Sequence, residues 1–355
     1  MTIPSGLLSE PPGSVVLVRM SSIGDTVHAL PLLASLRRAW PDSRLFWVLQ
    51  PVPYELMREH PEVERFFVFD RRRSVGAFPD LWRQVRGRRF DLVLDCHRYL
   101  KAGLVTAMLR APIKLGFDRA RARDLNWLFT THRIPPGVRS HVQDQYFEFL
   151  DYLGIPVVKE WDFFLTEPER EAQRTFFEAR DRPVLAVSLS SSRPEKNWIL
   201  KRYARVLDMA DFDLDLQPVF VGNASRVERM AARRVADLMR GRPVFALGDD
   251  LRRLVWLVEG SAVVLSPDTA SLHIAAALNT PVVGLYGVTD PRRTGPYGRF
   301  ADLVVDRYPR AGAKGLRGGS RRGDMAKITV NDVAEKLELA VRRYVEPRRA
   351  ARGPA

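Results

Sequence analysis

Three short polar loops in this chain carry residue types that bind or transfer charged groups. Residues 21–28 include Asp25, residues 188–198 include Lys196, and the third loop covers residues 266–273. Each follows an apolar, β-branched run and precedes a stretch of helical spacing, which predicts a strand-to-helix loop. Such a loop presents free backbone N–H groups at the start of a helix, where proteins bind phosphates and other anions.

The side chains in these loops allow both a chemical and a structural interpretation. The carboxylate of Asp25 can take a proton from an attacking hydroxyl, or it can only cap the following helix. Lys196 can donate to a diphosphate, or it can be an ordinary surface lysine. Asp268 and His273 suit an anion-binding loop, but an aspartate at a helix start is also a common cap and a first-turn histidine is often structural.

The sequence motifs of several other classes of enzyme are absent. The three-glycine dinucleotide fingerprint, the phosphate loop ending in Gly-Lys-Ser/Thr and the Gly-x-Ser-x-Gly elbow are all absent. His97 follows Asp95 and Cys96, but its neighbourhood in the sequence supplies too few ligands for a metal. We therefore predict no metal site, and a structural or acceptor-side role for His97.

Composition indicates a globular protein of two domains. The chain has 355 residues, of which 46% are hydrophobic and 28% charged, and no apolar run is long enough to cross a bilayer. The single cysteine and the lack of a signal-peptide pattern favour the cytosol. A net charge of +14 favours phosphates, anionic lipids or nucleic acid as partners, but no zinc spacing or RNA-binding signature accompanies the basic runs, so no nucleic acid is expected.

Short strands alternate with helices along the chain, which predicts an α/β fold with parallel sheets. Strands are expected at 14–19, 45–49, 66–69, 92–95, 113–116, 184–188, 218–221, 244–247, 262–265 and 282–285. Helices are expected at 27–39, 54–59, 79–86, 101–109, 141–153, 201–209, 226–239, 251–258 and 272–278. The predicted domains are 1–154 and 167–329 with a linker at 155–166, followed by a helix at 330–345 and a basic tail at 346–355. The Arg- and Gly-rich segment 307–322 is expected to be a mobile loop.

In combination, residues 21–31, the Lys196-Asn197-Trp198 loop, residues 268–278 and the Tyr286-Gly287-Val288-Thr289-Asp290-Pro291 segment resemble glycosyltransferase family nine, the lipopolysaccharide heptosyltransferases. The resemblance implies a GT-B architecture of two Rossmann-like domains facing a central cleft. It places the acceptor on the N-terminal domain and the nucleotide sugar on the C-terminal domain. It further implies an inverting transfer that needs neither a metal nor a cofactor.

The resemblance also assigns roles to residues. Asp25 matches the general base of the family. The donor diphosphate and sugar are expected to contact Lys196, Asp268, Thr269, Ala270, Ser271 and His273. The nucleoside is expected at Gly222, Asn223 and Ala224, where the acidic residue that often follows the glycine in relatives is missing, so the nucleoside stays open. For the acceptor we predict contacts from Ser22, Gly24, His97, Arg119, Arg121 and Arg123.

These features predict transfer of heptose from ADP-heptose to a phosphorylated glycolipid acceptor of the lipopolysaccharide inner core. The enzyme would act in the cytoplasm, at the anionic inner face of the bacterial inner membrane. One alternative keeps the fold but uses another nucleotide-diphosphate sugar for a different surface glycan. A second alternative is a basic module that binds nucleotide or nucleic acid without catalysis.

Overall fold

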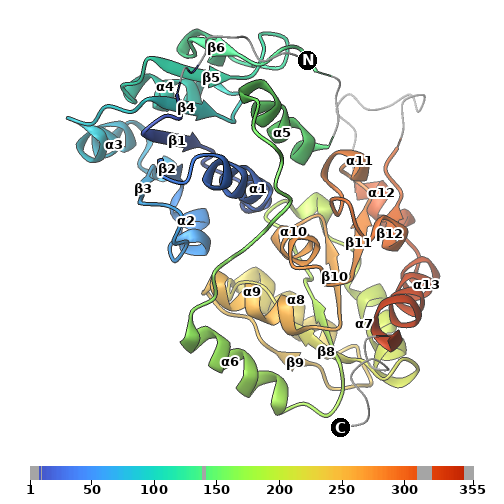
Figure 1. Cartoon of the computed structure of the whole chain (residues 1–355). Coiled ribbons are helices and arrows are strands. Elements are labelled where there is room, and N and C mark those ends of the chain that lie inside the picture. The colour runs from blue at the N-terminus through green and yellow to red at the C-terminus, as the bar shows by residue number, and fades with distance from the viewer. Residues whose placement is uncertain (1–7, 9, 138–140, 310–321, 348–355) are drawn as a thin grey trace. The chain divides into compact units, whose positions relative to one another are not determined.

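The computed structural model describes residue 8 and residues 10–137, 141–309 and 322–347 (Figure 1). The chain divides into two compact units, Met1–Phe164 (unit 1) and Leu165–Ala355 (unit 2). Most of the loop expected at 307–322 and of the tail expected at 346–355 lies outside the described residues. None of the helices in the described ranges combines the length and the apolar character needed to cross a bilayer.

Unit 1 is a six-stranded parallel sheet covered by helices on both faces. Its strands are β1 (Ser14–Val18), β2 (Arg44–Leu49), β3 (Arg65–Val68), β4 (Leu92–Asp95), β5 (Ile113–Gly116) and β6 (His132–Arg133). Its helices are α1 (Ile23–Ala39), α2 (Pro51–Met57), α3 (Ala77–Val85), α4 (Leu100–Met108) and α5 (Val142–Leu153). The strands lie in the order β3-β2-β1-β4-β5-β6, which is the Rossmann arrangement.

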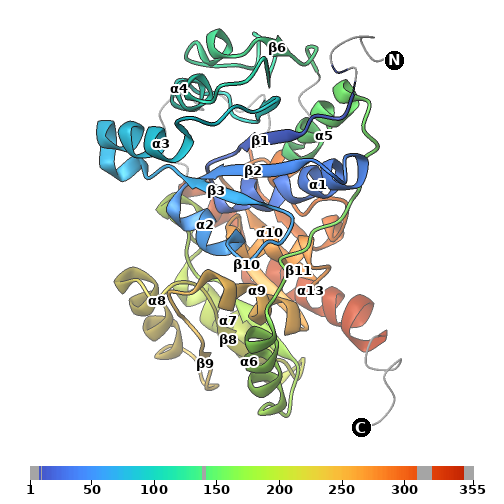
Figure 2. The same cartoon turned by 60° about the vertical axis from the view of Figure 1, so that its left-hand side comes forward.

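The core of unit 1 explains its apolar strands. Alternate side chains of β1 and β2, such as Val16 and Phe46, pack with the inner faces of α3 and α4 in one cluster. The intervening side chains, such as Leu17 and Trp47, are buried too and face the opposite side of the sheet. Figure 2 shows α3 and α4 on one side of β1 to β3 and α1 on the other. A sheet covered on both faces needs strands that are apolar throughout, and that pattern is the one seen in the sequence.

Unit 2 repeats this plan. Its strands are β7 (Val184–Val187), β8 (Gln217–Phe220), β9 (Val244–Phe245), β10 (Val263–Pro267), β11 (Val282–Tyr286) and β12 (Val304–Asp306). Its helices are α6 (Glu167–Glu178), α7 (Leu200–Phe212), α8 (Arg226–Ala236), α9 (Leu251–Gly260), α10 (Ala270–Ala277), α11 (Pro291–Thr294), α12 (Arg322–Lys327) and α13 (Val330–Ala340). The strand order is β12-β11-β10-β7-β8-β9, with all pairs parallel. Helix α7 packs against α8 and α13, and α9 packs against α6 and α10.

Strand order decides where each unit can bind a ligand. In unit 1 the chain order reverses between β1 and β4, and in unit 2 it reverses between β7 and β10. Loops that leave the carboxyl ends of two such strands diverge and open a crevice, which is the usual ligand site of a doubly wound sheet. The loop with Asp25 follows β1, the loop with Lys196 follows β7, and the loop with Asp268 follows β10.

The α/β class with two Rossmann-like sheets is confirmed, and the differences from the predicted elements are local. Helix α1 begins at Ile23 rather than at 27, so part of the polar loop is the first helical turn. Helix α6 and the short strands β6 and β12 were not expected from the sequence. The last helix runs over Val330–Ala340 and continues as one π-helical turn, Val341–Val345.

Candidate functional site

The loop after β1 holds an ion pair between Arg19 and Asp25. The Nη2 atom of Arg19 lies 2.5 Å from Oδ2 of Asp25. The same carboxylate oxygen accepts hydrogen bonds from the backbone N–H of Ser22 at 2.9 Å and from its hydroxyl at 3.0 Å. Ser22 is the N-cap of α1 and Asp25 is the third helical residue, so the carboxylate closes a capping box. Asp25 therefore supports the start of α1 from the third helical position, while Ser22 is the N-cap, and this contact uses only one of the two carboxylate oxygens.

The second carboxylate oxygen of Asp25 remains available. Within the described residues Oδ1 accepts no hydrogen bond, while the side chain is 26% exposed. Burial disfavours the charged form of Asp25, but the Arg19 guanidinium and the Ser22 N–H outweigh it and hold the pKa of Asp25 well below its usual range. The carboxylate is thus ionised at neutral pH, oriented through Oδ2 and open at Oδ1.

Arg19 is itself held firmly by the loop after β4. Its Nη1 donates to the Cys96 carbonyl at 3.0 Å and lies 3.1 Å from Nδ1 of His97, and its guanidinium lies 5.5 Å from the centre of the Tyr146 ring. Nε2 of His97 lies 2.7 Å from the Met20 backbone nitrogen, whose N–H it accepts. Burial and the Arg19 charge lower the pKa of His97 well below its usual value, so the ring is neutral. His97 therefore supports the loop that carries Asp25.

Behind His97, a buried carboxylate fixes the β4 loop. Oδ1 of Asp95 accepts from the His97 backbone N–H at 3.0 Å, and its Oδ2 accepts from Thr106 at 2.9 Å and from Asn126 at 3.0 Å. Burial raises the pKa of Asp95 to about 6 in spite of these bonds. The β1 and β4 loops are thus joined by hydrogen bonds at the switch point of unit 1.

The three arginines predicted to contact an acceptor differ from one another. Arg121 is mostly buried, where it pairs with Asp118 and Glu148. Arg119 is exposed and stacks on Trp127 with 4.3 Å between the guanidinium carbon and the ring centre, and Arg123 is exposed. Arg121 thus has a structural role through its ion pairs within unit 1. Arg119 and Arg123 instead present their charges to solvent. Of the other predicted acceptor residues, Ser22 is exposed and Gly24 is buried in the first turn of α1.

The switch point of unit 2 brings together the predicted donor residues. Lys196 Nζ lies 2.8 Å from Oδ2 of Asp268 and donates to the Asp268 carbonyl at 3.2 Å. The same Oδ2 accepts from the Thr289 hydroxyl at 2.7 Å, while Oδ1 lies 3.2 Å from Nε2 of His273. Asp268 is only 6% exposed. Although burial opposes its ionisation, His273 and Lys196 hold the pKa of Asp268 well below its usual range.

The rest of the donor loop is built as a helix start. Thr269 is the N-cap of α10, and Ala270 and Ser271 are its first two residues. The Thr269 hydroxyl lies 2.9 Å from that of Ser266, which fixes the turn. The N–H groups of a first helical turn have no partner inside their helix, so this turn offers donors to an anion beside the Lys196 ammonium.

An acidic side chain from α8 lies against the predicted nucleoside loop. Gly222 has φ +136°, and a Cβ atom there would collide with the carboxylate of Glu228. That carboxylate comes from the first turn of α8 and accepts a hydrogen bond from the Asn223 backbone, while the Ala224 N–H donates to Asp249 at 3.2 Å. Burial raises the pKa of Glu228 to about 7. A carboxylate therefore lies against Gly222, although it belongs to a residue six positions further along the chain.

The sequence reasoning missed three residues of these sites. Arg19 directly follows the apolar strand β1, and a charged residue at that position, close to the switch point, was a usable signal. Thr289 lies in segment 286–291, which contributed to the family resemblance but was given no role at a site. Glu228 had no signal, because its role depends on how α8 folds back on Gly222. The described residues include no group of three or more His, Cys, Asp or Glu side chains able to hold a metal ion.

Two doubly wound units, with a lysine beside a helix start at the switch point of the second, fit the class of nucleotide-sugar transferases. Comparison with known proteins gives the family. The model of glycosyltransferase family 9 (heptosyltransferase) matches residues 79–344, so the chain belongs to this family and is a glycosyltransferase. It is similar to lipopolysaccharide core heptosyltransferase OpsX of Haemophilus influenzae, with 28% identity over 84% of this chain and 86% of the relative. It is also 27% identical to lipopolysaccharide heptosyltransferase 1 of Escherichia coli K12, over 83% of this chain and 94% of the relative.

Solved structures show the same fold. A family 9 glycosyltransferase from Veillonella parvula superposes with a TM-score of 0.79 at 21% identity, covering 93% of this chain and 97% of the other. E. coli heptosyltransferase WaaC with ADP-2-deoxy-2-fluoro heptose superposes with a TM-score of 0.71 at 22% identity, covering 92% and 99%. The predicted family and its GT-B fold are confirmed.

Proposed function

We propose that this glycosyltransferase transfers heptose from ADP-heptose to a phosphorylated glycolipid of the lipopolysaccharide inner core, with inversion and without a metal. Residues 1–154 would bind the acceptor and residues 167–329 the nucleotide sugar. Membership of the family supports the reaction class, and the heptosyltransferase relatives support the sugar. The single observation that carries the mechanism is the carboxylate of Asp25, ionised, fixed through Oδ2 and open at Oδ1.

In this mechanism Asp25 is the general base. The acceptor hydroxyl loses its proton to Oδ1 as its oxygen attacks the anomeric carbon, and the bond from that carbon to the β-phosphate oxygen breaks. ADP leaves with the bonding electron pair. A base on one side and a leaving group on the other make a single displacement, which inverts the anomeric centre. Arg19 keeps the Asp25 carboxylate ionised and oriented before the acceptor binds.

The leaving diphosphate needs stabilisation, for which unit 2 has fixed donors. The Lys196 ammonium and the first turn of α10 at Thr269, Ala270 and Ser271 would face the phosphates. Asp268 would not bind phosphate, because two anions repel each other. Instead it would hold Lys196 and His273 in place, which explains why both of its oxygens are occupied. These fixed charges would do the work that a divalent metal does in other transferases.

The nucleoside would bind beside the Gly222-Asn223-Ala224 loop. Glu228 there supports a ribose contact, since a carboxylate beside the loop can accept from a ribose hydroxyl. The net charge of +14 and exposed arginines such as Arg119 and Arg123 support an acceptor that carries phosphates, and attachment to the anionic inner face of the bacterial inner membrane. The enzyme would therefore act in the cytoplasm.

A donor panel tests the reaction. Purified enzyme is incubated with a deacylated, phosphorylated inner-core oligosaccharide and with ADP-heptose, UDP-glucose or GDP-mannose in turn, and the released nucleotide is measured. We expect acceptor-dependent release of ADP from ADP-heptose at a rate at least about tenfold above that of the other donors. Faster release from one of the hexose donors would move the enzyme to another surface glycan. No turnover of any donor, with tight binding to DNA that falls steeply with salt, would favour the non-catalytic alternative.

A further inference from the structure

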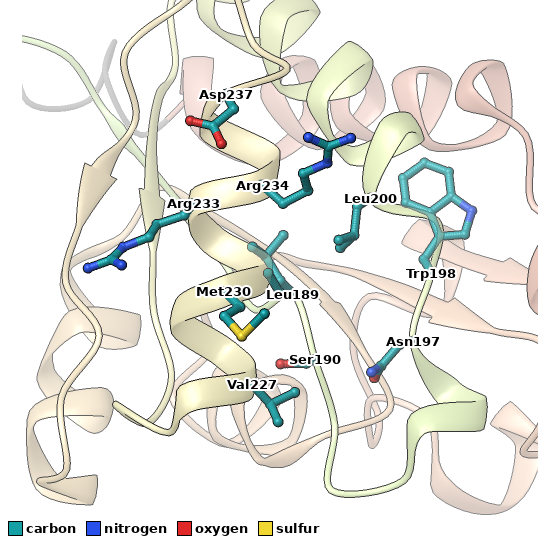
Figure 3. Close-up of a pocket in the computed structure, with 11 residues that line it drawn as sticks. Leu189, Ser190, Asn197, Trp198, Leu200, Val227, Met230, Arg233, Arg234 and Asp237 are labelled. Atoms are coloured by element: carbon teal, nitrogen blue, oxygen red, sulfur yellow. The ribbon is translucent and has the colours of Figure 1, made fainter.

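A groove in unit 2 remains unused by the proposed reaction. It has a volume of about 570 Å³ and lies between the segment that follows β7 and helix α8 (Figure 3). Its lining consists of Leu189, Ser190, Asn197, Trp198, Leu200, Val227, Met230, Ala231, Arg233, Arg234 and Asp237. The groove is distinct from the donor cluster, because Lys196, Asp268 and His273 do not line it.

One wall of the groove is an apolar stripe of α8. Val227, Met230 and Ala231 follow one another at helical spacing, and Arg234 continues the stripe. Val227 is 69% exposed and Met230 58% exposed, so large apolar side chains stand in solvent at the mouth. Figure 3 shows Met230 beside Leu189, with Val227 nearer to Ser190. Neighbouring apolar side chains that stay exposed in this way mark a surface that binds another apolar group.

The floor of the groove offers one unused polar group. Ser190 is 6% exposed, and its hydroxyl oxygen is buried with no hydrogen-bond partner among the described residues. In Figure 3 this hydroxyl is directed toward α8, next to Val227 and Met230. A buried hydroxyl without a partner costs free energy, so a ligand that accepts its hydrogen bond would be favoured there.

The other end of the groove is positively charged. Arg233 and Arg234 form no ion pair with any described residue, and Arg234 reaches toward Leu200 in Figure 3. Asp237 lies at the same end and offsets one of the two charges, which leaves a net charge of +1 on the lining. The groove thus joins apolar walls and a buried hydroxyl at one end to the guanidinium group of Arg234 at the other, whereas the guanidinium of Arg233 is directed to the other side of α8 (Figure 3).

We propose that this groove binds an anionic phospholipid of the membrane. An acyl chain would lie along Leu189, Val227 and Met230, the ester carbonyl would accept from Ser190, and the phosphate would bind Arg234. This is the class of molecule whose apolar and anionic parts match the two ends of the groove. The inference rests on the proposed attachment to a membrane surface, and it locates that attachment on α8.

Vesicle binding by matched double variants tests the charged end. Flotation with vesicles of phosphatidylglycerol and phosphatidylcholine is measured without donor or acceptor for wild type, R233Q/R234Q and K201Q/R205Q. The control pair removes the same charge from exposed positions of α7 that do not line the groove. Since each basic residue near an anionic surface contributes about fivefold in affinity, the groove variant should bind about 25-fold more weakly and the control within about twofold of wild type. An equal loss of vesicle affinity in both variants would contradict binding of the phospholipid in the groove.

Fluorescence tests whether the chain enters the groove. Trp198 lines it, so phosphatidylglycerol with brominated acyl chains should quench part of the emission of wild type, and that part should be missing in Trp198→Phe. The exposed residue Met230, changed to Gln, should weaken both flotation and quenching. Flotation without any Trp198-dependent quenching would overturn the proposal in favour of plain surface attraction. Turnover with the deacylated acceptor is measured on the same proteins, so a failure of catalysis is recorded separately from a failure of lipid binding.

Discussion

Asp25 in unit 1 and Asp268 in unit 2 both lie at the switch point of a sheet of the same plan, Asp25 after the first strand of its unit and Asp268 after the fourth, but their surroundings differ. Each lies where a strand at the switch point leads into a helix, and each is kept ionised by a neighbouring cation, Arg19 or Lys196. All three donors to Asp25 reach Oδ2 alone, whereas Asp268 uses both oxygens and is buried. In the proposed mechanism, this open oxygen is what distinguishes a carboxylate that takes a proton from one that only positions its neighbours.

The largest effect is expected from Asp25→Asn. The amide keeps the shape of the side chain but cannot accept the proton, so turnover should fall by about 10² to 10⁴ while ADP affinity stays near wild type. Initial rates with ADP-heptose and the deacylated acceptor, together with calorimetric titration of ADP, provide the measurement. Turnover within a few-fold of wild type would remove Asp25 from the role of base.

A smaller effect is expected from Lys196→Ala. A charge-assisted hydrogen bond to phosphate is worth about 1.5 to 3 kcal/mol, so the affinity for ADP should fall by roughly 10- to 150-fold, and that for adenosine much less. Lys201→Ala removes an exposed lysine of α7 and is the control. Thermal unfolding of each variant checks that loss of the ion pair between Lys196 and Asp268 has not disrupted the loop. If ADP and adenosine lose affinity equally, Lys196 does not face the diphosphate.

Arg19→Gln should change the pH dependence of turnover. In the wild type Arg19 keeps the pKa of Asp25 low, so the base stays ionised down to acidic pH. Without the guanidinium, burial dominates and the pKa of Asp25 rises, so activity should be lost at a higher pH on the acidic side. Arg19→Lys retains a cation and should shift the acidic limb less. An acidic limb that coincides in all three proteins would show that Arg19 does not control the ionisation of Asp25.

The smallest effect is expected from chelation. If Lys196 and the start of α10 stabilise the leaving diphosphate, then EDTA should change turnover by less than about twofold. Activity lost on chelation and restored by magnesium or manganese would contradict the metal-free mechanism.

Of the three arginines predicted to contact the acceptor, only two suit a test by charge reversal. Reversal of Arg121 would break its pairs with Asp118 and Glu148, so it would report on folding as much as on binding. Arg119 and Arg123 are exposed, and reversing these two charges together should raise the acceptor Michaelis constant without changing donor affinity. A collapse of donor affinity with an unchanged acceptor constant would remove these arginines from the acceptor side.

Sequence alone predicted the two sheets because buried parallel strands must be apolar throughout and their helices must be amphipathic. It failed at α6, whose described residues include none that is buried, and at β6 and β12, which are edge strands of two and three residues. Asp25 and Lys196 were recognisable from loops that are contiguous in sequence. Glu228 was not, because it meets Gly222 only through the fold, and Arg19 was taken for the end of a strand.

The most direct test of the difference between the two aspartates is a single-turnover experiment on Asp25→Asn and Asp268→Asn. Enzyme in excess over the acceptor is first mixed with ADP-heptose, and the acceptor is then added. The reaction is quenched at successive times and the product is quantified, and this is repeated across a range of enzyme concentrations. We predict that Asp25→Asn slows the chemical step at saturation and leaves the concentration dependence unchanged. Asp268→Asn should mainly require more enzyme for saturation, because Lys196 and His273 lose their anchor. A slow chemical step in Asp268→Asn, with a normal one in Asp25→Asn, would contradict this account.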